Sequence, residues 1–354
     1  MSAFFSEKYK SLTPYTPGEQ PKDTVYIKLN TNESPYPPSD RAIAAAAEAA
    51  GRLNLYPDPE CYALTSKLAE ILGVHREEVL LTNGSDEILN FAFMAYCDES
   101  HPAVFPDITY GFYKVFAQIN NIPYETIPLR YDFSIDLQDY IGINKTIFIA
   151  NPNAPTGLAL TRDEIEEILK SNPDNVVVID EAYIDFGGES AVPLIKKYDN
   201  LLVTQTFSKS RSMAGARLGF GVGCKELIRD LNTIKYSTNP YNINMMTMAA
   251  GLGMLEDEAV TIERCAKIRE TRAYTLCELR RLGFEGADSE TNFVFVRHPK
   301  LDGSMYYAKL RENGILVRYF DTERLREYNR ITIGTRLQME KFIQVTEKIL
   351  EEAL

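Results

Sequence analysis

The chain has 354 residues, enough for about two domains, and its 45% hydrophobic and 25% charged residues are typical of a globular protein with a sizeable core. Its net charge of −12 argues against a nucleic-acid-binding surface, which needs a basic stripe. Residues 1–21 lack the apolar run of a signal peptide, no stretch approaches the roughly 18 apolar residues of a membrane span, and the five cysteines and three histidines form no Cys-x-x-Cys pair or metal-binding constellation. These features predict a cytoplasmic protein with no membrane segment, no disulfide framework and no metal.

Short apolar runs alternate with helical segments from residue 79 to about residue 223. The runs lack polar alternation, which is typical of strands covered on both faces. One helix opens with the capping box Thr161-Arg162-Asp163-Glu164. This alternation predicts a mostly parallel α/β sheet with helices on both faces. The predicted strands are 79–82, 103–105, 146–150, 176–179 and 201–204, and the predicted helices between them are 85–96 and 161–170.

The pattern changes after Asn239-Pro240-Tyr241. Residues 242–282 are helical, with a break expected near Glu256-Asp257, and strands are predicted at 292–296, 314–317 and 330–333. A helix is predicted at 304–312, and residues 338–354 form an amphipathic helix. We therefore expect a large α/β domain over residues 33–241 and a small α+β domain, with an N-terminal arm, made of residues 1–32 and 242–354.

The segment Thr204-Gln205-Thr206-Phe207-Ser208-Lys209 carries a lysine and hydroxyls just past a predicted strand, and Arg217 follows it. Upstream, the apolar strand Val176–Ile179 ends in Asp180. A strand-terminal aspartate is commonly a turn or capping residue, and Asp180-Glu181 could also bind magnesium, but the phosphate loop of a nucleotidase is absent. Pyridoxal 5'-phosphate requires an amine for its aldehyde, a carboxylate for its ring nitrogen and a cation with hydroxyls for its phosphate. The combined set predicts a site for this cofactor.

Other segments add candidate contacts to this site. Gly84 and Ser85 stand between a strand and a helix, where backbone N–H groups and the helix dipole bind anions, although an ordinary turn with a serine cap would look the same. Tyr110 could stack on a cofactor ring or simply be core, and Tyr183 could approach the ring oxygen or only pack. The proline-rich loop 151–157 could lie beside the ring oxygen or be only a turn.

Arg330 starts an apolar strand, where an arginine is either a surface charge or a clamp for a carboxylate or phosphate. We favour the clamp. Arg318, after Ile315-Leu316-Val317, is a weaker candidate for the same anion.

These motifs, in this order, resemble the fold-type I, class II pyridoxal-phosphate aminotransferases, and the segments 12–18, 29–36 and 330–336 are similar to the histidinol-phosphate aminotransferase family. The resemblance implies that Lys209 forms the internal aldimine and then shuttles the substrate proton, that Asp180 binds the ring nitrogen, and that Tyr183 binds the ring oxygen. The remaining implied roles are stacking by Tyr110, phosphate binding by Gly84, Ser85, Thr206, Ser208 and Arg217, phosphate binding by Tyr56 from the neighbouring subunit of a homodimer, and substrate-phosphate contacts by Tyr15 and Arg330.

One position departs from the family pattern. Members of the family often have an asparagine directly before Pro-Thr-Gly, hydrogen-bonded to the ring oxygen, and here that position is Ala154. Asn153 or Asn151 could substitute, or Tyr183 could act alone.

The resemblance implies transfer of the amino group of L-histidinol phosphate to 2-oxoglutarate, which yields imidazole acetol phosphate and L-glutamate in histidine biosynthesis. Arg330 could clamp the phosphate of one substrate and the carboxylate of the other, because a ping-pong cycle binds them in turn. The alternatives with the same cofactor are a threonine-phosphate decarboxylase and, third, an aromatic aminotransferase. A regulator without turnover lacks an appended DNA-binding segment, and an ATPase lacks its phosphate loop.

Overall fold

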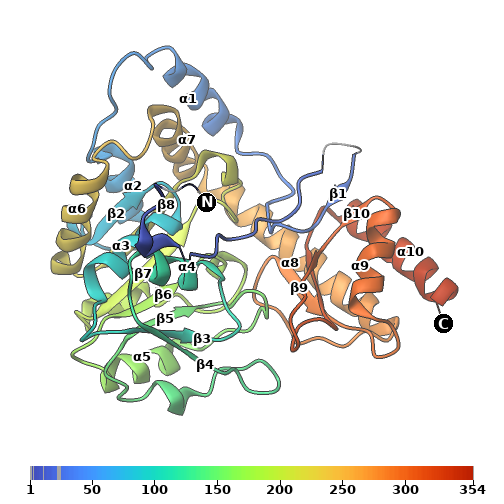
Figure 1. Ribbon diagram of the computed structural model, residues 1–354. Helices are drawn as coiled ribbons and strands as arrows, with labels where there is room; N and C mark the ends of the chain where they lie inside the picture. The colour runs from blue at the N-terminus through green and yellow to red at the C-terminus, as the bar shows by residue number, and fades with distance from the viewer. Residues whose placement is uncertain (1, 3, 11, 22–24, 354) are drawn as a thin grey trace.

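In the computed structural model, which describes residues 2, 4–10, 12–21 and 25–353, a seven-stranded sheet has the strand order β2-β8-β7-β6-β5-β3-β4 (Figure 1). Neighbouring strands are parallel except at β8, which runs antiparallel to both β2 and β7. The prediction of a mostly parallel α/β sheet is confirmed. The strands are β2 (Val79–Thr82), β3 (Ala103–Pro106), β4 (Tyr124–Ile127), β5 (Thr146–Ala150), β6 (Val177–Asp180), β7 (Leu201–Thr206) and β8 (Gly219–Gly223).

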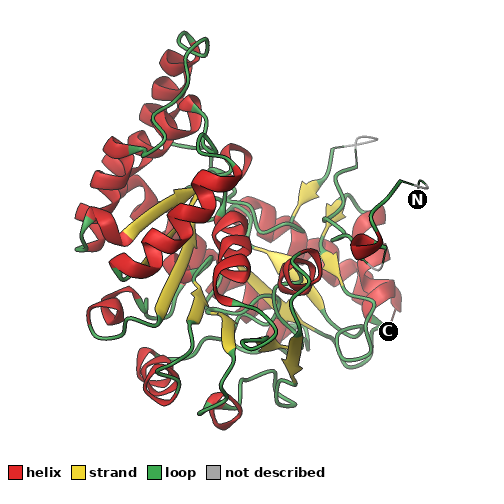
Figure 2. Cartoon of the chain, turned by 60° about the vertical axis from the view of Figure 1, so that its left-hand side comes forward, coloured by secondary structure: helices red, strands yellow, loops and turns green. Residues whose placement is uncertain are grey.

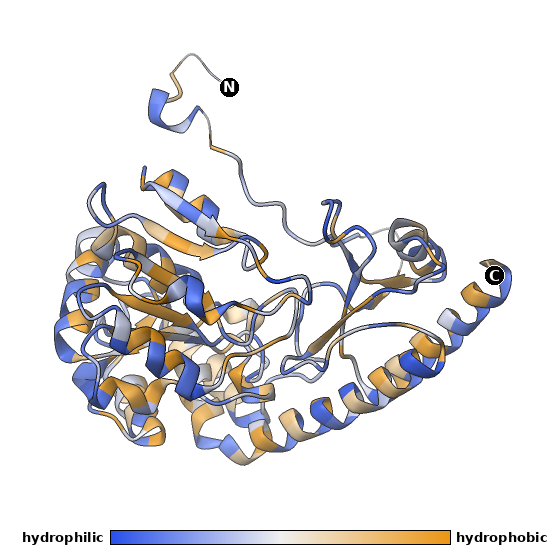
Figure 3. Ribbon diagram, turned by 90° about the horizontal axis from the view of Figure 1, so that it is seen from below, coloured by the Kyte–Doolittle hydropathy of each residue, from blue (hydrophilic) through white to orange (hydrophobic). Residues whose placement is uncertain are grey.

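Helices cover both faces of this sheet, as Figure 2 shows in red around the yellow strands. Successive side chains of a strand enter opposite cores: in β6, Val177 and Ile179 join one core and Val178 joins the other. This double burial explains the continuous apolar runs, and parts of the strands are correspondingly orange in Figure 3. The first core contains side chains of α1 (Asp40–Ala50), α2 (Tyr62–Leu72), α5 (Arg162–Ser171) and α7 (Met245–Glu256), and the second those of α3 (Ser85–Tyr96), α4 (Phe112–Ile119) and α6 (Lys225–Thr238).

Strand β8 was not predicted, because Gly219, Gly221 and Gly223 make its sequence resemble a loop. The structure explains these glycines. A Cβ at Gly219 would lie 2.2 Å from the backbone nitrogen of Ser85, and one at Gly221 would lie 2.9 Å from Ile88. The strand therefore needs glycine because α3 packs directly on it, and this close packing sets the position of the start of α3.

A second, smaller unit contains the antiparallel sheet β11-β12-β9 and the parallel pair β1-β10. The helix α8 leads into it from α7, and the predicted break between these helices is present at Asp257. These elements share their own core of buried apolar side chains. They are β1 (Ile27–Lys28), β9 (Phe293–Val296), β10 (Ile315–Leu316), β11 (Arg318–Tyr319), β12 (Asn329–Thr332), α8 (Glu258–Arg281), α9 (Gly303–Glu312) and α10 (Arg336–Ala353).

The N-terminal residues connect the two units. The ring of Tyr15 stacks on Phe112 of α4 at 4.3 Å between centroids, whereas Glu19 binds Arg311 of α9. The division of the chain at residues 32/33 and 241/242 remains a prediction, and α7, beyond the second boundary, shares the core of the large sheet.

Within the described ranges, no helix is both long and apolar enough to cross a membrane. Histidine, cysteine and acidic side chains also form no group of three or more suited to a metal ion in the same part of the chain.

Candidate active site

A cavity of about 100 Å³ lies at the carboxyl ends of β6 and β7. Its lining includes Asp180, the last residue of β6, and Lys209, which follows β7. A larger cavity of about 660 Å³ shares four lining residues with it, Tyr110, Ala154, Tyr183 and Lys209, and extends to Tyr15, Arg318 and Arg330. The two cavities together bring the side chains predicted for the cofactor next to those predicted for the substrate.

Asp180 is buried at the base of the smaller cavity. Its Oδ2 accepts a hydrogen bond from the hydroxyl of Tyr113 at 3.1 Å, whereas Oδ1 has no partner among the described residues. Burial raises the pKa of this carboxyl to about 7. A buried carboxylate oxygen without a partner fits a protonated ring nitrogen, which would restore the stabilisation that burial removes.

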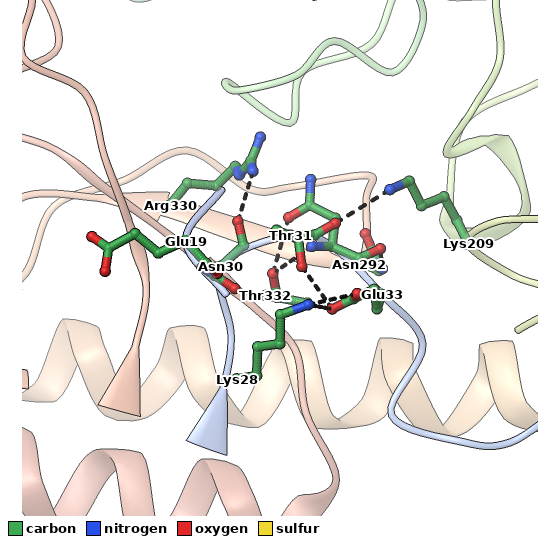
Figure 4. Close-up of polar contacts among 10 residues, drawn as sticks. Glu19, Lys28, Asn30, Thr31, Glu33, Lys209, Asn292, Arg330 and Thr332 are labelled. Carbon is green, nitrogen blue, oxygen red and sulfur yellow. Dashed lines mark hydrogen bonds and ion pairs between the residues drawn. The ribbon is translucent and has the colours of Figure 1, made fainter. Parts of the chain in front are cut away.

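Lys209 enters the site from the turn that follows β7. Its Nζ donates to the backbone oxygen of Thr31 at 3.3 Å, and it lies 5.8 Å from the centroid of the Tyr183 ring. Figure 4 shows the lysine reaching toward the segment of residues 30–33. The amine therefore projects into the space between this segment and the sheet, where an aldehyde could reach it.

The opposite end of the smaller cavity is suited to a phosphate. Ser85 begins α3, and the side chains of Thr206 and Ser208 are buried beside it. Arg217 donates to Ser208 Oγ at 3.3 Å and to Asp86 Oδ2 at 2.7 Å. Gly84 has a φ of 81°, and a Cβ there would lie 2.7 Å from Arg217 Nη2. A helix N-terminus, two hydroxyls and an arginine thus meet at one place.

Tyr110 and Asn153 differ in their position relative to this cavity. Tyr110 lines it and donates its hydroxyl to Asp86 Oδ1 at 2.6 Å. Asn153 is not among the lining residues in the described chain. Its Oδ1 accepts from Thr109, and its Nδ2 donates to Ile108 O and Thr156 Oγ1. The amide of Asn151 is bonded to Leu160. Both asparagines are engaged elsewhere, and Tyr183 is the residue that lines the cavity next to Ala154.

Arg330 and Arg318 are directly paired across β12 and β11. Arg330 is enclosed between the rings of Phe293 and Phe320, donates from Nη2 to Asn30 O at 3.1 Å, and has a buried Nε without a partner in the described structure. Burial lowers the pKa of its guanidinium. Like charges opposite each other on neighbouring strands are unfavourable. An anion in the larger cavity would relieve this repulsion and could bind the free Nε.

Tyr56 lies away from both cavities. Its side chain is 81% exposed, and its ring stacks on Tyr241 at 4.7 Å between centroids. A role for Tyr56 in a site therefore requires the site of another copy of the chain.

Sequence reasoning assigned no role to three residues that the structure brings to the site. Asp86 binds both Tyr110 and Arg217, Tyr113 binds Asp180, and Asn32 donates from Nδ2 to the hydroxyl of Tyr183 at 2.9 Å. A helical period offered a signal for Tyr113, which follows Tyr110 by one turn. Asn32 gave no such signal, because its partners Tyr183 and Thr332 are far away in the sequence.

Comparisons with known proteins agree with this geometry. The model of the family "Aminotransferase class I and II" matches residues 24–345. A histidinol-phosphate aminotransferase of Brachyspira hyodysenteriae is 49% identical over 99% of this chain and 100% of its own length, and one of Clostridium beijerinckii is 46% identical over 99% and 98%. The structure is similar, with a TM-score of 0.88 and 23% identity over 99% of each chain, to that of histidinol-phosphate aminotransferase from Sinorhizobium meliloti in complex with pyridoxal-5'-phosphate. The chain belongs to the class I and II aminotransferases.

Proposed function

We propose that this protein is a pyridoxal-phosphate-dependent aminotransferase that moves the amino group of L-histidinol phosphate to 2-oxoglutarate, in histidine biosynthesis. The observation that carries the proposal is the buried Oδ1 of Asp180, which has no partner in the described part of the chain and belongs to the same cavity as Lys209. Full-length relatives that carry the name of this activity support the choice of substrate.

The residues of the cavity divide the work of holding the cofactor. Lys209 Nζ would bind its aldehyde carbon, Asp180 would hold the protonated ring nitrogen, and Tyr183 would donate to the ring oxygen. Ser85 and Gly84 present backbone N–H groups to the phosphate, with Thr206, Ser208 and Arg217 around it, and Tyr110 covers the ring. When bound, pyridoxal phosphate supplies an electron sink for the pair of electrons released at the substrate α-carbon. Lys209 Nζ would accept the proton from that carbon and donate it to the cofactor carbon that had carried the aldehyde.

The larger cavity holds the anionic end of each substrate. Beside Nη2, Arg330 has a buried Nε without a partner among the described residues, and the guanidinium packs against two aromatic rings. Charge-assisted bonds are strong in such surroundings, and a guanidinium can bind either a phosphate or a carboxylate in a bidentate manner. Arg318 and Tyr15 lie on the same cavity and add weaker contacts.

The test is a half-reaction with four amino donors. Purified protein loaded with pyridoxal phosphate is mixed separately with L-histidinol phosphate, L-threonine phosphate, L-phenylalanine or L-glutamate, and the absorbance of the bound cofactor is followed. We expect fast changes with histidinol phosphate and glutamate only. A fast reaction of threonine phosphate with release of carbon dioxide would identify the decarboxylase instead, and a preference for phenylalanine would identify an aromatic aminotransferase.

We also infer a homodimer in which Tyr56 of the partner subunit completes each phosphate site. Support comes from the high exposure of Tyr56 and of its apolar neighbours Leu53, Leu55 and Tyr62, which are 55–60% exposed. The test mixes subunits carrying Tyr56→Phe with subunits carrying Lys209→Ala. Shared sites give each heterodimer one intact site, so activity exceeds that of either parent. If Tyr56→Phe alone is clearly impaired and mixing recovers nothing, the sites are not shared.

A cytoplasmic location likewise remains a prediction, from the cysteine pattern.

A further inference from the structure

Tyr183 has a fixed neighbour that no motif indicated. Asn32 is buried, with its Nδ2 2.9 Å from the Tyr183 hydroxyl, and its Oδ1 accepts from the hydroxyl of Thr332 at 3.0 Å. Its backbone has a φ of 56°, a left-handed conformation that asparagine tolerates better than most residues. The backbone oxygen of Asn32 accepts from Asn292 Nδ2 at 3.0 Å, so Asn292, which precedes β9, and Thr332 of β12 together hold this residue.

The network determines which end of the Asn32 amide faces Tyr183. The backbone N–H of Asn32 donates to Thr332 Oγ1 at 3.0 Å, which leaves the proton of that hydroxyl for another acceptor. That acceptor is Asn32 Oδ1, so the NH₂ end must point to Tyr183.

An amide N–H that donates to the phenol oxygen leaves the phenol free to donate its own proton. Within the described residues the Tyr183 hydroxyl accepts the bond from Asn32 and donates none, and Tyr183 lines the cavity together with Ala154 and Lys209. We propose that Asn32, held by Thr332, is a positioning residue that makes Tyr183 a one-way hydrogen-bond donor to the cofactor ring oxygen. Through Tyr183, Asn32 thereby supports the hydrogen bond to the ring oxygen that the asparagine replaced by Ala154 would make directly.

The inference rests on the proposed function for the identity of the cofactor, and it predicts a spectroscopic change. A hydrogen bond donated to the ring oxygen lowers the proton affinity of the Lys209-bound cofactor. Loss of the donor therefore raises the pH at which the absorbance of the bound cofactor changes. Asn32→Ala should raise this midpoint by about 1 pH unit, the scale of one hydrogen bond. Three sets of charged groups around Tyr183 remain in every variant: Lys209 and Arg330, which face it, Asp180, which lines the same cavity, and the Lys28–Glu33 pair behind the segment.

Thr332 provides the matched pair of variants. Thr332→Ser keeps the hydroxyl and should keep the wild-type midpoint, whereas Thr332→Val has a similar shape without the hydroxyl and should raise it. Tyr183→Phe should raise it at least as much as Asn32→Ala, and the double variant should show no further rise, because both act through one hydrogen bond.

Wild-type midpoints in both Asn32→Ala and Thr332→Val, with a shifted midpoint in Tyr183→Phe, would overturn the proposal. An unshifted Tyr183→Phe would overturn it as well. Failure of the proposed function looks different: wild-type protein would bind no cofactor, or would bind it without reacting with histidinol phosphate. In the latter case the midpoints still decide the role of Asn32.

Discussion

Two walls of the site are built in opposite ways. The wall at the ends of β6 and β7 carries Asp180, the last residue of β6, and Lys209, which follows the adjacent parallel strand β7 in the same stretch of sequence. The facing wall joins residues 30–33 to β12, through contacts such as Asn32 with Thr332 that span 300 positions. Among the described residues, the first wall leaves Asp180 Oδ1 without a partner. On the second wall, Asn32 forms hydrogen bonds through its side chain and its backbone, whereas Arg330 Nε, Asn30 Oδ1 and Asn292 Oδ1 have no partner in the same part of the chain. Of these atoms, Asp180 Oδ1 and Arg330 Nε belong to charged side chains that line the two cavities, where an oppositely charged ligand atom would restore the stabilisation that burial removes.

Removing the amine of the first wall should have the largest effect. Lys209→Ala should lower the single-turnover rate with L-histidinol phosphate by about 1,000-fold or more, because it deletes both the nucleophile and the proton carrier. The variant should still bind cofactor non-covalently, which dialysis followed by absorbance can measure. Peptide mapping after borohydride reduction of the wild type should place the adduct on Lys209, and an adduct on another lysine would contradict the assignment.

A comparison of Asp180 with Glu181 tests whether cofactor binding needs a buried carboxylate oxygen that has no partner among the described residues. Burial raises the pKa of both carboxyls to about 7, but Glu181 is bonded to Ala191 N, Ser190 Oγ and Gln205 Nε2. A carboxyl whose pKa rises on folding holds its proton more tightly in the folded state. Folded-state stability is therefore lost as pH rises from about 4 to about 7.

We expect apoprotein carrying Asp180→Asn to gain stability over the wild type as pH rises through that range, by at most about 4 kcal/mol. Urea unfolding at pH 5, 6.5 and 8 measures the gain. Asp180→Asn should also weaken cofactor binding, whereas Glu181→Gln, which lies outside the cavity lining, should leave it near the wild-type value. Equal losses of cofactor affinity in both variants would remove the distinction between the two acids.

On the second wall, the two arginines Arg330 and Arg318 allow a similar comparison. Arg330 is enclosed and Arg318 is more exposed, so Arg330→Ala should cost several kcal/mol, about 100-fold in the half-reactions with both histidinol phosphate and glutamate. Arg330→Lys should recover little, since an ammonium cannot offer the same fork. Arg318→Ala should be milder. A normal reaction of Arg330→Ala with histidinol phosphate would move the clamp to Arg318, which lines the same cavity.

Tyr15 should show the smallest effect. Tyr15→Phe keeps the ring that stacks on Phe112 and removes one neutral hydroxyl, worth about 1 kcal/mol. We expect a KM for histidinol phosphate raised by about fivefold and a KM for glutamate that changes less. Steady-state kinetics with each substrate separate the two, and equal increases would assign Tyr15 to general packing.

The sequence predicted the wall of the sheet in detail because its signals are local. Continuous apolar runs indicated doubly buried strands, the capping box placed the start of α5, and the residues at strand ends had to meet because parallel strands end at one edge. Strand β8 was not predicted, because its glycines are required by the packing of α3 against it, and no local sequence pattern indicates that packing.

The second wall was decided by tertiary structure. Sequence alone indicated Arg330 and Tyr183 as candidates, but not the residues that hold them. The hydrogen bonds that hold them join residues 30–32, 183, 292 and 330–332. These contacts produce no periodic pattern in the sequence, because the two partners of a hydrogen bond can lie at any distance along the chain. The sequence thus determined which chemical groups are present, and the packing of the two sheets against the N-terminal segment determined which of them remain free to bind.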